Sequence, residues 1–355
     1  MPVLLLMWLS TGKASTQSAG VLAAVHAIGI LVSLVVLPAT GTFFPRSGWL
    51  FGAAGLLLGA LVLSYWIGGT GLLLAWWLAG ICAGLMQYVG SVVCSQAINQ
   101  RAAFALRLAV SLLFAGCAIL MVVGVEALGV SMPLIWLLVV LEAVILCFAL
   151  YLLRDIPANQ GALPPWTRHS FFAPSGGLLA LFALFLGQVG FYVYVLKSVS
   201  ASGELAPQEV AIALALAKLT VSLVMYALIR KGHDLVSKLG FVSVACVLIA
   251  AVLLLGQAQH VTLVVIGFVL WELCFNTLVA AFQGELAKRH QTFVGMWASV
   301  PVFLGAAAGP AMHGWLLARG WGAAFLLLAV LSALGPALWM GVSTGRLIPK
   351  QGEST

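Results

Sequence analysis

Charged residues are scarce in this chain. Only 7% of its 355 residues are Asp, Glu, Lys or Arg, whereas 63% are apolar. No soluble core could bury so large an apolar fraction, so a soluble globular protein is excluded. The formal net charge of +7 does not indicate nucleic-acid binding, because most of the basic residues lie in alternate loops between apolar runs.

The chain also lacks the motifs of several enzyme classes. It contains no His-Glu-x-x-His zinc motif and no Gly-x-x-x-x-Gly-Lys-Ser/Thr phosphate loop. Its six cysteines all lie in apolar runs without metal-ligand spacing, so we expect them to be small packing residues. No loop is long enough for a catalytic domain, and no nucleophile and base stand at helical spacing. We therefore expect no enzyme activity, no cofactor, no metal site and no ATP-driven machinery.

Long apolar runs are abundant. About 20 apolar residues in a helix cross a bilayer core about 30 Å thick, and a helix satisfies its own backbone hydrogen bonds in lipid. The runs predict an all-α polytopic membrane protein with eleven complete transmembrane helices, at 17–40, 48–66, 70–94, 102–127, 131–153, 174–197, 208–229, 236–256, 260–283, 292–318 and 320–345.

The first residues form a shorter apolar segment. Pro2 to Leu9 is too short to cross a bilayer, and it has no basic segment before it, unlike a signal peptide. We interpret it as the end of a partial N-terminal helix whose beginning is missing.

The basic residues indicate the orientation of the chain. If the loop after 17–40 is cytoplasmic, twelve of the sixteen Lys and Arg residues lie at cytoplasmic loops or ends. This bias follows the positive-inside rule, predicts a bacterial inner (plasma) membrane protein and places the C-terminus in the cytoplasm. The twelve are Arg46, Arg101, Arg107, Arg154, Arg168, Arg230, Lys231, Lys238, Lys288, Arg289, Arg346 and Lys350.

Two motifs resemble those of one transporter family. The loop after 17–40 reads Gly41-x-x-x-Pro45-Arg46-x-Gly48-Trp49, and the run 292–318 contains Gly305-x-x-x-Gly309-Pro310-x-x-x-Gly314. These are similar to the gating-loop and helix-bend motifs of the major facilitator superfamily. Two further stretches match the family pattern. The sequence Arg230-Lys231-Gly232-His233-Asp234 is a weaker match to the loop motif in the second half, and the polar segment from Arg319 to Phe325 is similar to the family's usual entry into the last helix.

The sequence departs from the family pattern at several positions. Pro45 replaces the acidic residue of the loop motif, Trp49 and Leu50 replace its basic pair, and Trp76 stands where the fourth family helix usually has arginine. The glycine–proline motif of antiporters is absent from 102–127.

The resemblance implies two pseudo-symmetric helical halves. They are residues 1–153, with a partial helix 1 and helices 2–6, and residues 174–345, with helices 7–12. A central cytoplasmic loop at 154–173 separates them, and a cytoplasmic tail follows at 346–355. The resemblance also implies that spans 48–66, 236–256 and 320–345 face lipid, whereas the spans with polar residues face a central cavity.

Two ionisable residues lie near the middle of predicted spans. An ionisable side chain at mid-bilayer costs at least about 2.5–3.5 kcal/mol, so it usually has a function. Our hypothesis is that Glu272 carries a coupling proton and that substrate competes with Lys218 for this carboxylate. The alternative is a buried structural ion pair.

Other polar and aromatic residues are candidates for a substrate site, although each could equally pack between helices. Arg107 is either an anion contact or a side chain that snorkels to the interface, and His26 is either a proton relay or a packed residue. The substrate-site candidates are His26, Gln87, Arg107, Gln188, Tyr192, Trp271, Asn276 and Trp297.

These features favour a secondary active transporter that moves a small organic solute by alternating access. We expect H⁺ as the coupling ion, and we expect the protein to be a monomer surrounded by lipid. Aromatic residues in the polar spans favour export, whereas the missing antiporter motif favours an uptake symporter. A transporter-like sensor or non-transporting remnant is an alternative, suggested by the incomplete first helix. A membrane enzyme would need an acidic or nucleophilic cluster at one interface, which the sequence does not show.

Overall fold

The computed structural model describes residues 16–39, 47–127, 143, 175–200, 205–232, 235–290 and 299–345. These residues form ten long α-helices, each within one predicted span or a few residues longer. The helices are α2 (Thr16–Ala39), α3 (Ser47–Trp66), α4 (Gly69–Gln96), α5 (Gln100–Ala127), α8 (Ser175–Ser200), α9 (Pro207–Arg230), α10 (Leu235–Gln257), α11 (Val261–His290), α13 (Ser299–Ala318) and α14 (Gly322–Gly345).

Some predicted segments lie outside the described residues. They are the partial N-terminal helix, the span 131–153 apart from residue 143, the loop 154–173 and the tail 346–355. The structure therefore bears out an all-helical chain, while the count of eleven complete spans is not confirmed.

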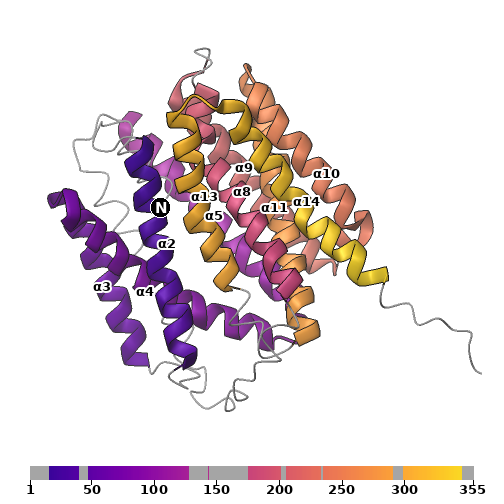
Figure 1. Ribbon diagram of the computed structural model, residues 1–355, viewed down its shortest axis with the longest axis horizontal. Coiled ribbons are helices and arrows are strands. Elements are labelled where there is room, and N and C mark those ends of the chain that lie inside the picture. Colours follow the sequence, from indigo (N-terminus) through magenta and orange to yellow (C-terminus); the bar gives the residue numbers. More distant parts are fainter. Residues whose placement is uncertain are drawn as a thin grey trace, which may run out of the picture.

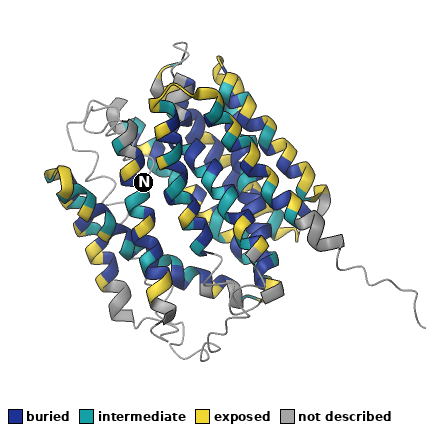
Figure 2. Cartoon of the chain, in the orientation of Figure 1, coloured by how far each residue is buried: buried dark blue, intermediate teal, exposed yellow. Residues whose placement is uncertain are grey.

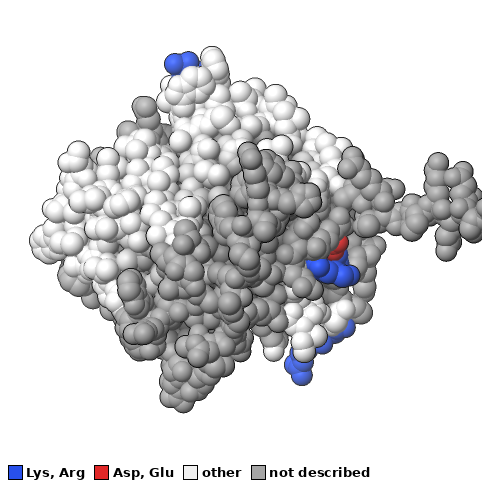
Figure 3. Space-filling model, turned by 60° about the horizontal axis from the view of Figure 1, so that its bottom comes forward, with Lys and Arg blue, Asp and Glu red and all other residues white. Residues whose placement is uncertain are grey.

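The described helices suit a lipid environment. Eight of them are long and apolar enough to cross a membrane, and α2 and α3 contain shorter apolar segments at Gly20–Val36 and Gly52–Ser64. The exposed side chains are mostly large and apolar, such as Leu56, Leu223 and Leu338, which are each about two-thirds exposed. Figure 2 shows exposed residues along the outer sides of the helices, and Figure 3 shows few charged side chains among broad uncharged areas. The chain is an integral membrane protein.

The helices pack in two groups joined along two seams. In the N-terminal group, α2–α5, both α2 and α3 pack on α4, and in the C-terminal group, α8–α14, both α9 and α10 pack on α11. Helix α8 lies against α13 and α14. One seam between the groups joins α2 to α13, and the other joins α5 to α9 and α11 (Figure 1).

The glycines of the predicted helix-bend motif lie where helices come closest. A Cβ on Gly309 would stand 3.1 Å from the backbone nitrogen of Gly190, and one on Gly305 would stand 2.6 Å from the backbone oxygen of Phe182. Glycine at these positions lets the backbones of α8 and α13 touch, which is how small residues hold membrane helices together. Pro310 and Gly314 are buried in the same helix. A role in bending α13 stays a prediction.

Candidate functional site

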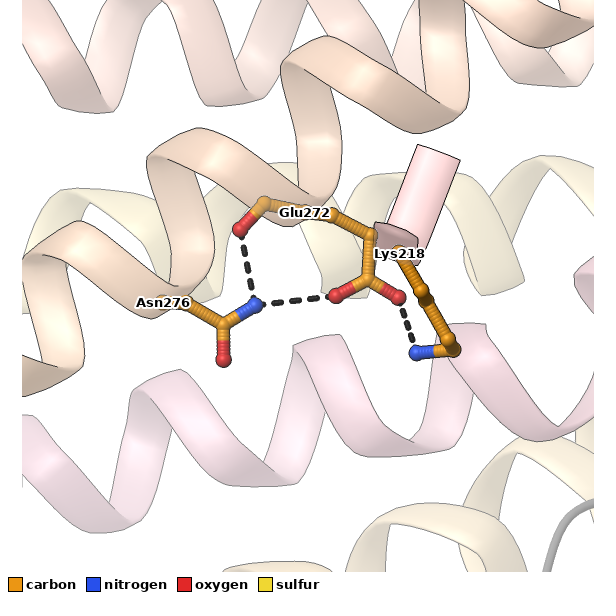
Figure 4. Close-up of polar contacts among 3 residues, drawn as sticks. All are labelled: Lys218, Glu272 and Asn276. Atoms are coloured by element: carbon orange, nitrogen blue, oxygen red, sulfur yellow. Dashed lines mark hydrogen bonds and ion pairs between the residues drawn. The ribbon is translucent and has the colours of Figure 1, made fainter. Parts of the chain in front are cut away.

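A buried ion pair joins the middle of two helices. Lys218 is the twelfth residue of the 24-residue α9, and Glu272 is the twelfth residue of the 30-residue α11. The Nζ atom of Lys218 donates a hydrogen bond to Oε1 of Glu272 (Figure 4), and the two side chains are only 6% and 2% exposed. Each charge therefore has its main compensation in the other.

Asn276 completes the surroundings of the carboxylate. It follows Glu272 by four residues, which places both side chains on one face of α11. Its Nδ2 atom donates to Oε2 of Glu272 at 2.9 Å and to the Glu272 backbone oxygen at 2.7 Å. Figure 4 shows the carboxylate held between the amide on one side and the ammonium group on the other. Both carboxylate oxygens thus accept a hydrogen bond.

Three aromatic rings stack beside the ion pair. Nζ of Lys218 lies 4.6 Å from the centre of the Tyr192 ring, a cation–π contact. The Tyr192 ring is parallel to that of Trp271 at 5.3 Å, and Trp271 is parallel to Phe275 at 5.5 Å. The charged pair therefore borders flat apolar faces, a combination that suits an organic molecule with both polar and apolar parts.

A buried glutamine fixes the position of the stack. Nε1 of Trp271 donates to Oε1 of Gln188 at 2.7 Å. Nε2 of Gln188 donates to the backbone oxygen of Ala329 at 2.6 Å and to Oγ of Ser332 at 3.0 Å. Gln188 is fully buried, so these bonds satisfy the polar atoms of its side chain and tie α8, α11 and α14 together.

The remaining candidates lie elsewhere in the bundle. His26 Nδ1 is 3.3 Å from the Trp76 backbone oxygen and its ring meets the Trp76 ring edge-on, so it packs between α2 and α4. Gln87 is half-buried on α4. Arg107 donates from Nη1 to Oγ of Ser91 at 2.9 Å, between α5 and α4. The structure brings Gln188, Tyr192, Lys218, Trp271, Glu272 and Asn276 into one cluster and leaves these three apart from it.

Other predicted site residues cannot be placed. Gly41, Arg46 and Trp297 lie outside the described residues, and Gly48 lies in the first turn of α3. Among the residues that the structure describes, no group of three or more His, Cys, Asp or Glu side chains could hold a metal ion.

Sequence reasoning missed Ser332 and Ser299. Ser332 lies in a run so apolar that we expected all of it to face lipid, yet it is 5% exposed and binds Gln188. Ser299 has no polar residue at helical spacing that would have drawn attention to it, and it faces Ser91 across the seam between the groups.

Three solved structures share this arrangement of helices, and each is named as a transporter. The human organic anion transporter MFSD10 (TETRAN) aligns over 93% of this chain and 87% of its own, with a TM-score of 0.65 and 14% identity. The nucleoside transporter NupG and its D323A mutant align over 96% of this chain and 94% of their own, with TM-scores of 0.63 and 0.66 and 14% identity. No known family's sequence model matches the chain, and no curated protein matches it in sequence. The chain has the fold of these major-facilitator-type transporters.

Proposed function

We propose that this protein is a secondary active transporter that moves a small organic solute across the membrane by alternating access. In this proposal Glu272 carries the coupling proton, Lys218 is its counter-ion, and the stacked rings of Tyr192 and Trp271 contact the solute. In this proposal the protein acts as a monomer in a bacterial inner membrane. The distribution of Lys and Arg favours a C-terminus in the cytoplasm.

The single observation that carries the proposal is the ion pair of Lys218 and Glu272 in the middle of its two helices. Placing ionisable groups at this depth is costly, and such groups commonly serve as proton relays or substrate contacts. A proton on Glu272 would leave Lys218 without its anion, and the ammonium group would then be free to bind an acceptor on the solute. Loss of the proton would restore the pair and release that contact.

The packing of the helices supports alternating access. The contacts of α2 and α3 with α4 in the N-terminal group correspond to those of α9 and α10 with α11 in the C-terminal group. Repeats of this kind rock against one another around a central site. The correspondence supports two pseudo-symmetric halves at 1–153 and 174–345, and the seams α2–α13 and α5–α9 are where they would move.

The neighbours support a small organic substrate. One is named as an organic anion transporter and another as a nucleoside transporter. The aromatic stack favours export of an amphipathic solute, which is the direction we propose. Binding of proton and solute together, as in the scheme above, favours the alternative, an uptake symporter.

The test compares metabolites in cells and medium by untargeted mass spectrometry. Four strains are compared: a deletion strain, and the same strain complemented with the wild-type protein, with Glu272→Gln or with Glu209→Gln. Glu209→Gln is the matched control, because Glu209 is exposed at the start of α9. A compound retained inside the deletion and Glu272→Gln strains, but not inside the Glu209→Gln strain, is the expected result for an exporter that needs Glu272.

Other outcomes would change the proposal. A compound that accumulates in the medium instead would identify an uptake symporter. A Glu272→Gln protein that inserts correctly and keeps its full pH-dependent transport would show that the ion pair is structural. Equal metabolite profiles in all four strains would refute transport and favour a transporter-like sensor or a non-transporting remnant.

A further inference from the structure

A second polar cluster lies at a seam between the two groups of helices. Oγ of Ser91, on α4, accepts a hydrogen bond from Nη1 of Arg107, on α5, at 2.9 Å. The same oxygen lies 3.1 Å from Oγ of Ser299, on α13. Ser91 and Ser299 are 2% and 5% exposed, and Arg107 is half-buried. The cluster therefore joins the N-terminal group to the C-terminal group inside the bundle.

The cluster has more donors than acceptors. A guanidinium group has five N–H donors and no acceptor, and each hydroxyl has one donor. Only one bond is possible between the two hydroxyls, so one hydroxyl proton has no acceptor among the described residues, whichever serine donates. Among the described residues, the Arg107 side chain donates to Ser91 and also interacts with the thiol of Cys94, which is a weak acceptor. The cluster thus lacks hydrogen-bond acceptors.

The cluster also has an uncompensated positive charge. Lys218 is paired with Glu272, and Arg101 is paired with Glu285 at 2.6 Å. Arg107 contacts no carboxylate among the residues described by the structure. A buried or half-buried charge without a counter-ion is costly, so this guanidinium group suits an anion that the described residues do not supply.

The guanidinium group does not extend to the end of the helices. Its Nε would lie 3.5 Å from a Cβ built on Gly90, and its Nη1 binds Ser91. Gly90 and Ser91 precede the end of α4 at Gln96 by five or six residues, which is about 8 Å of helix. Snorkelling to the interface would carry the group toward that end. It lies instead beside Gly90, where no side chain intervenes, between α4 and α5.

We propose that Arg107, Ser91 and Ser299 form a binding site for an oxyanion, the carboxylate or phosphate group of an anionic organic solute. This inference rests on the proposed transport function and names the class of its substrate. The planar guanidinium group matches two oxygens of one such group, and the hydroxyl donor without a partner reaches a further lone pair. Because the three residues come from α5, α4 and α13, a bound anion contacts both groups of helices.

The test is a binding measurement that does not depend on transport. Purified protein in phosphatidylcholine nanodiscs is titrated with benzoate, with its uncharged amide benzamide and with inorganic phosphate, and the unfolding temperature is followed. In the wild-type protein we expect saturable stabilisation by benzoate or phosphate and none by benzamide. Arg107→Gln should weaken the apparent affinity at least tenfold, whereas Arg230→Gln, an identical change at an exposed arginine, should leave it unchanged.

Two further variants keep the test decisive. Ser299→Ala should weaken binding several-fold without removing the charge, which covers the case in which Arg107→Gln fails to fold. Glu272→Gln should bind benzoate at least as tightly as the wild type, so a failure of proton coupling would not be mistaken for a failure of this site.

Three results would overturn the inference. The first is equal stabilisation of the protein by benzoate and by benzamide. The second is an unchanged affinity for benzoate in both Arg107→Gln and Ser299→Ala. The third is loss of the stabilisation by benzoate when phosphatidylglycerol is added to the nanodiscs. The last result would assign the site to a lipid headgroup rather than to a solute.

Discussion

Removing Lys218 should destabilise the protein far more than removing the whole ion pair. Lys218→Met leaves the carboxylate of Glu272, which is 2% exposed, with Asn276 as its remaining hydrogen-bond partner. Breaking a buried pair in this way costs about 3–5 kcal/mol, because an uncompensated charge stays buried. Lys218→Met/Glu272→Gln removes both charges, and the new amide oxygen can still accept from Asn276. The second substitution should therefore restore about 2–3 kcal/mol.

The assay is thermal unfolding in a neutral detergent at several pH values. At about 2 °C per kcal/mol for a large domain, Lys218→Met should lower the unfolding temperature by about 6–10 °C. The double variant should recover about 4–6 °C of this loss.

One result would refute this reasoning. A double variant that is no more stable than Lys218→Met at any pH would show that packing of the lysine side chain, and not its charge, stabilises this part of the bundle. Glu209→Gln serves as the control for a general effect of removing a carboxylate, because Glu209 is exposed.

Three further predictions concern the packing of the helices. Gly309→Ala should lower the unfolding free energy by about 1–3 kcal/mol because its Cβ would meet the backbone of α8, whereas Gly52→Ala, with nothing within 4 Å, should be neutral or stabilising by up to about 1 kcal/mol. Glu285→Gln should cost less than about 1 kcal/mol because its partner Arg101 is 36% exposed. Gln188→Leu should cost about 2–4 kcal/mol, since it leaves a buried indole N–H without its acceptor. Unfolding curves of the four variants check all three.

The course of the helices could be predicted from the sequence because membrane helices are set by length and apolarity. Eight of the ten described helices begin and end within a few residues of the predicted spans. Helix α13 is described only from Ser299, within the span 292–318, and α11 extends to His290 beyond the apolar run. That extension carries Lys288 and other polar residues, and hydropathy alone cannot detect a helix that continues past the bilayer.

The site could be predicted only in part. Asn276 could be associated with Glu272 because four residues separate them on one helix, and an ionisable residue in mid-span attracts attention by its rarity. The bond between Gln188 and Ser332 could not be predicted, because it depends on which face of α14 turns toward α8. The contact of Ser299 could not be predicted either, because its partner Ser91 lies 208 positions away in the sequence.

The two polar clusters together determine the sign of coupling between a proton and an anion. Ser222 Oγ donates to the Ala109 backbone oxygen and so fixes the register of antiparallel α9 and α5. Lys218 is four residues to one side of this bond and Arg107 two residues to the other, so they are about 9 Å apart along the bundle. Packed helix axes lie about 8 Å apart, so the charges of the two clusters are separated by roughly 12 Å in total. At that distance they interact by about 1–1.5 kcal/mol at an effective dielectric constant of about 20.

A negative charge on Glu272 therefore disfavours an anion at Arg107, and a proton on Glu272 favours it. Linkage is reciprocal, so a bound anion must also favour the proton. The expected result is that benzoate binds up to about tenfold more tightly to Glu272→Gln than to the wild-type protein at the same pH. Such coupling favours movement of the anion and the proton in the same direction. Weaker binding of benzoate to Glu272→Gln than to the wild-type protein would reverse this conclusion and favour exchange of the anion against protons.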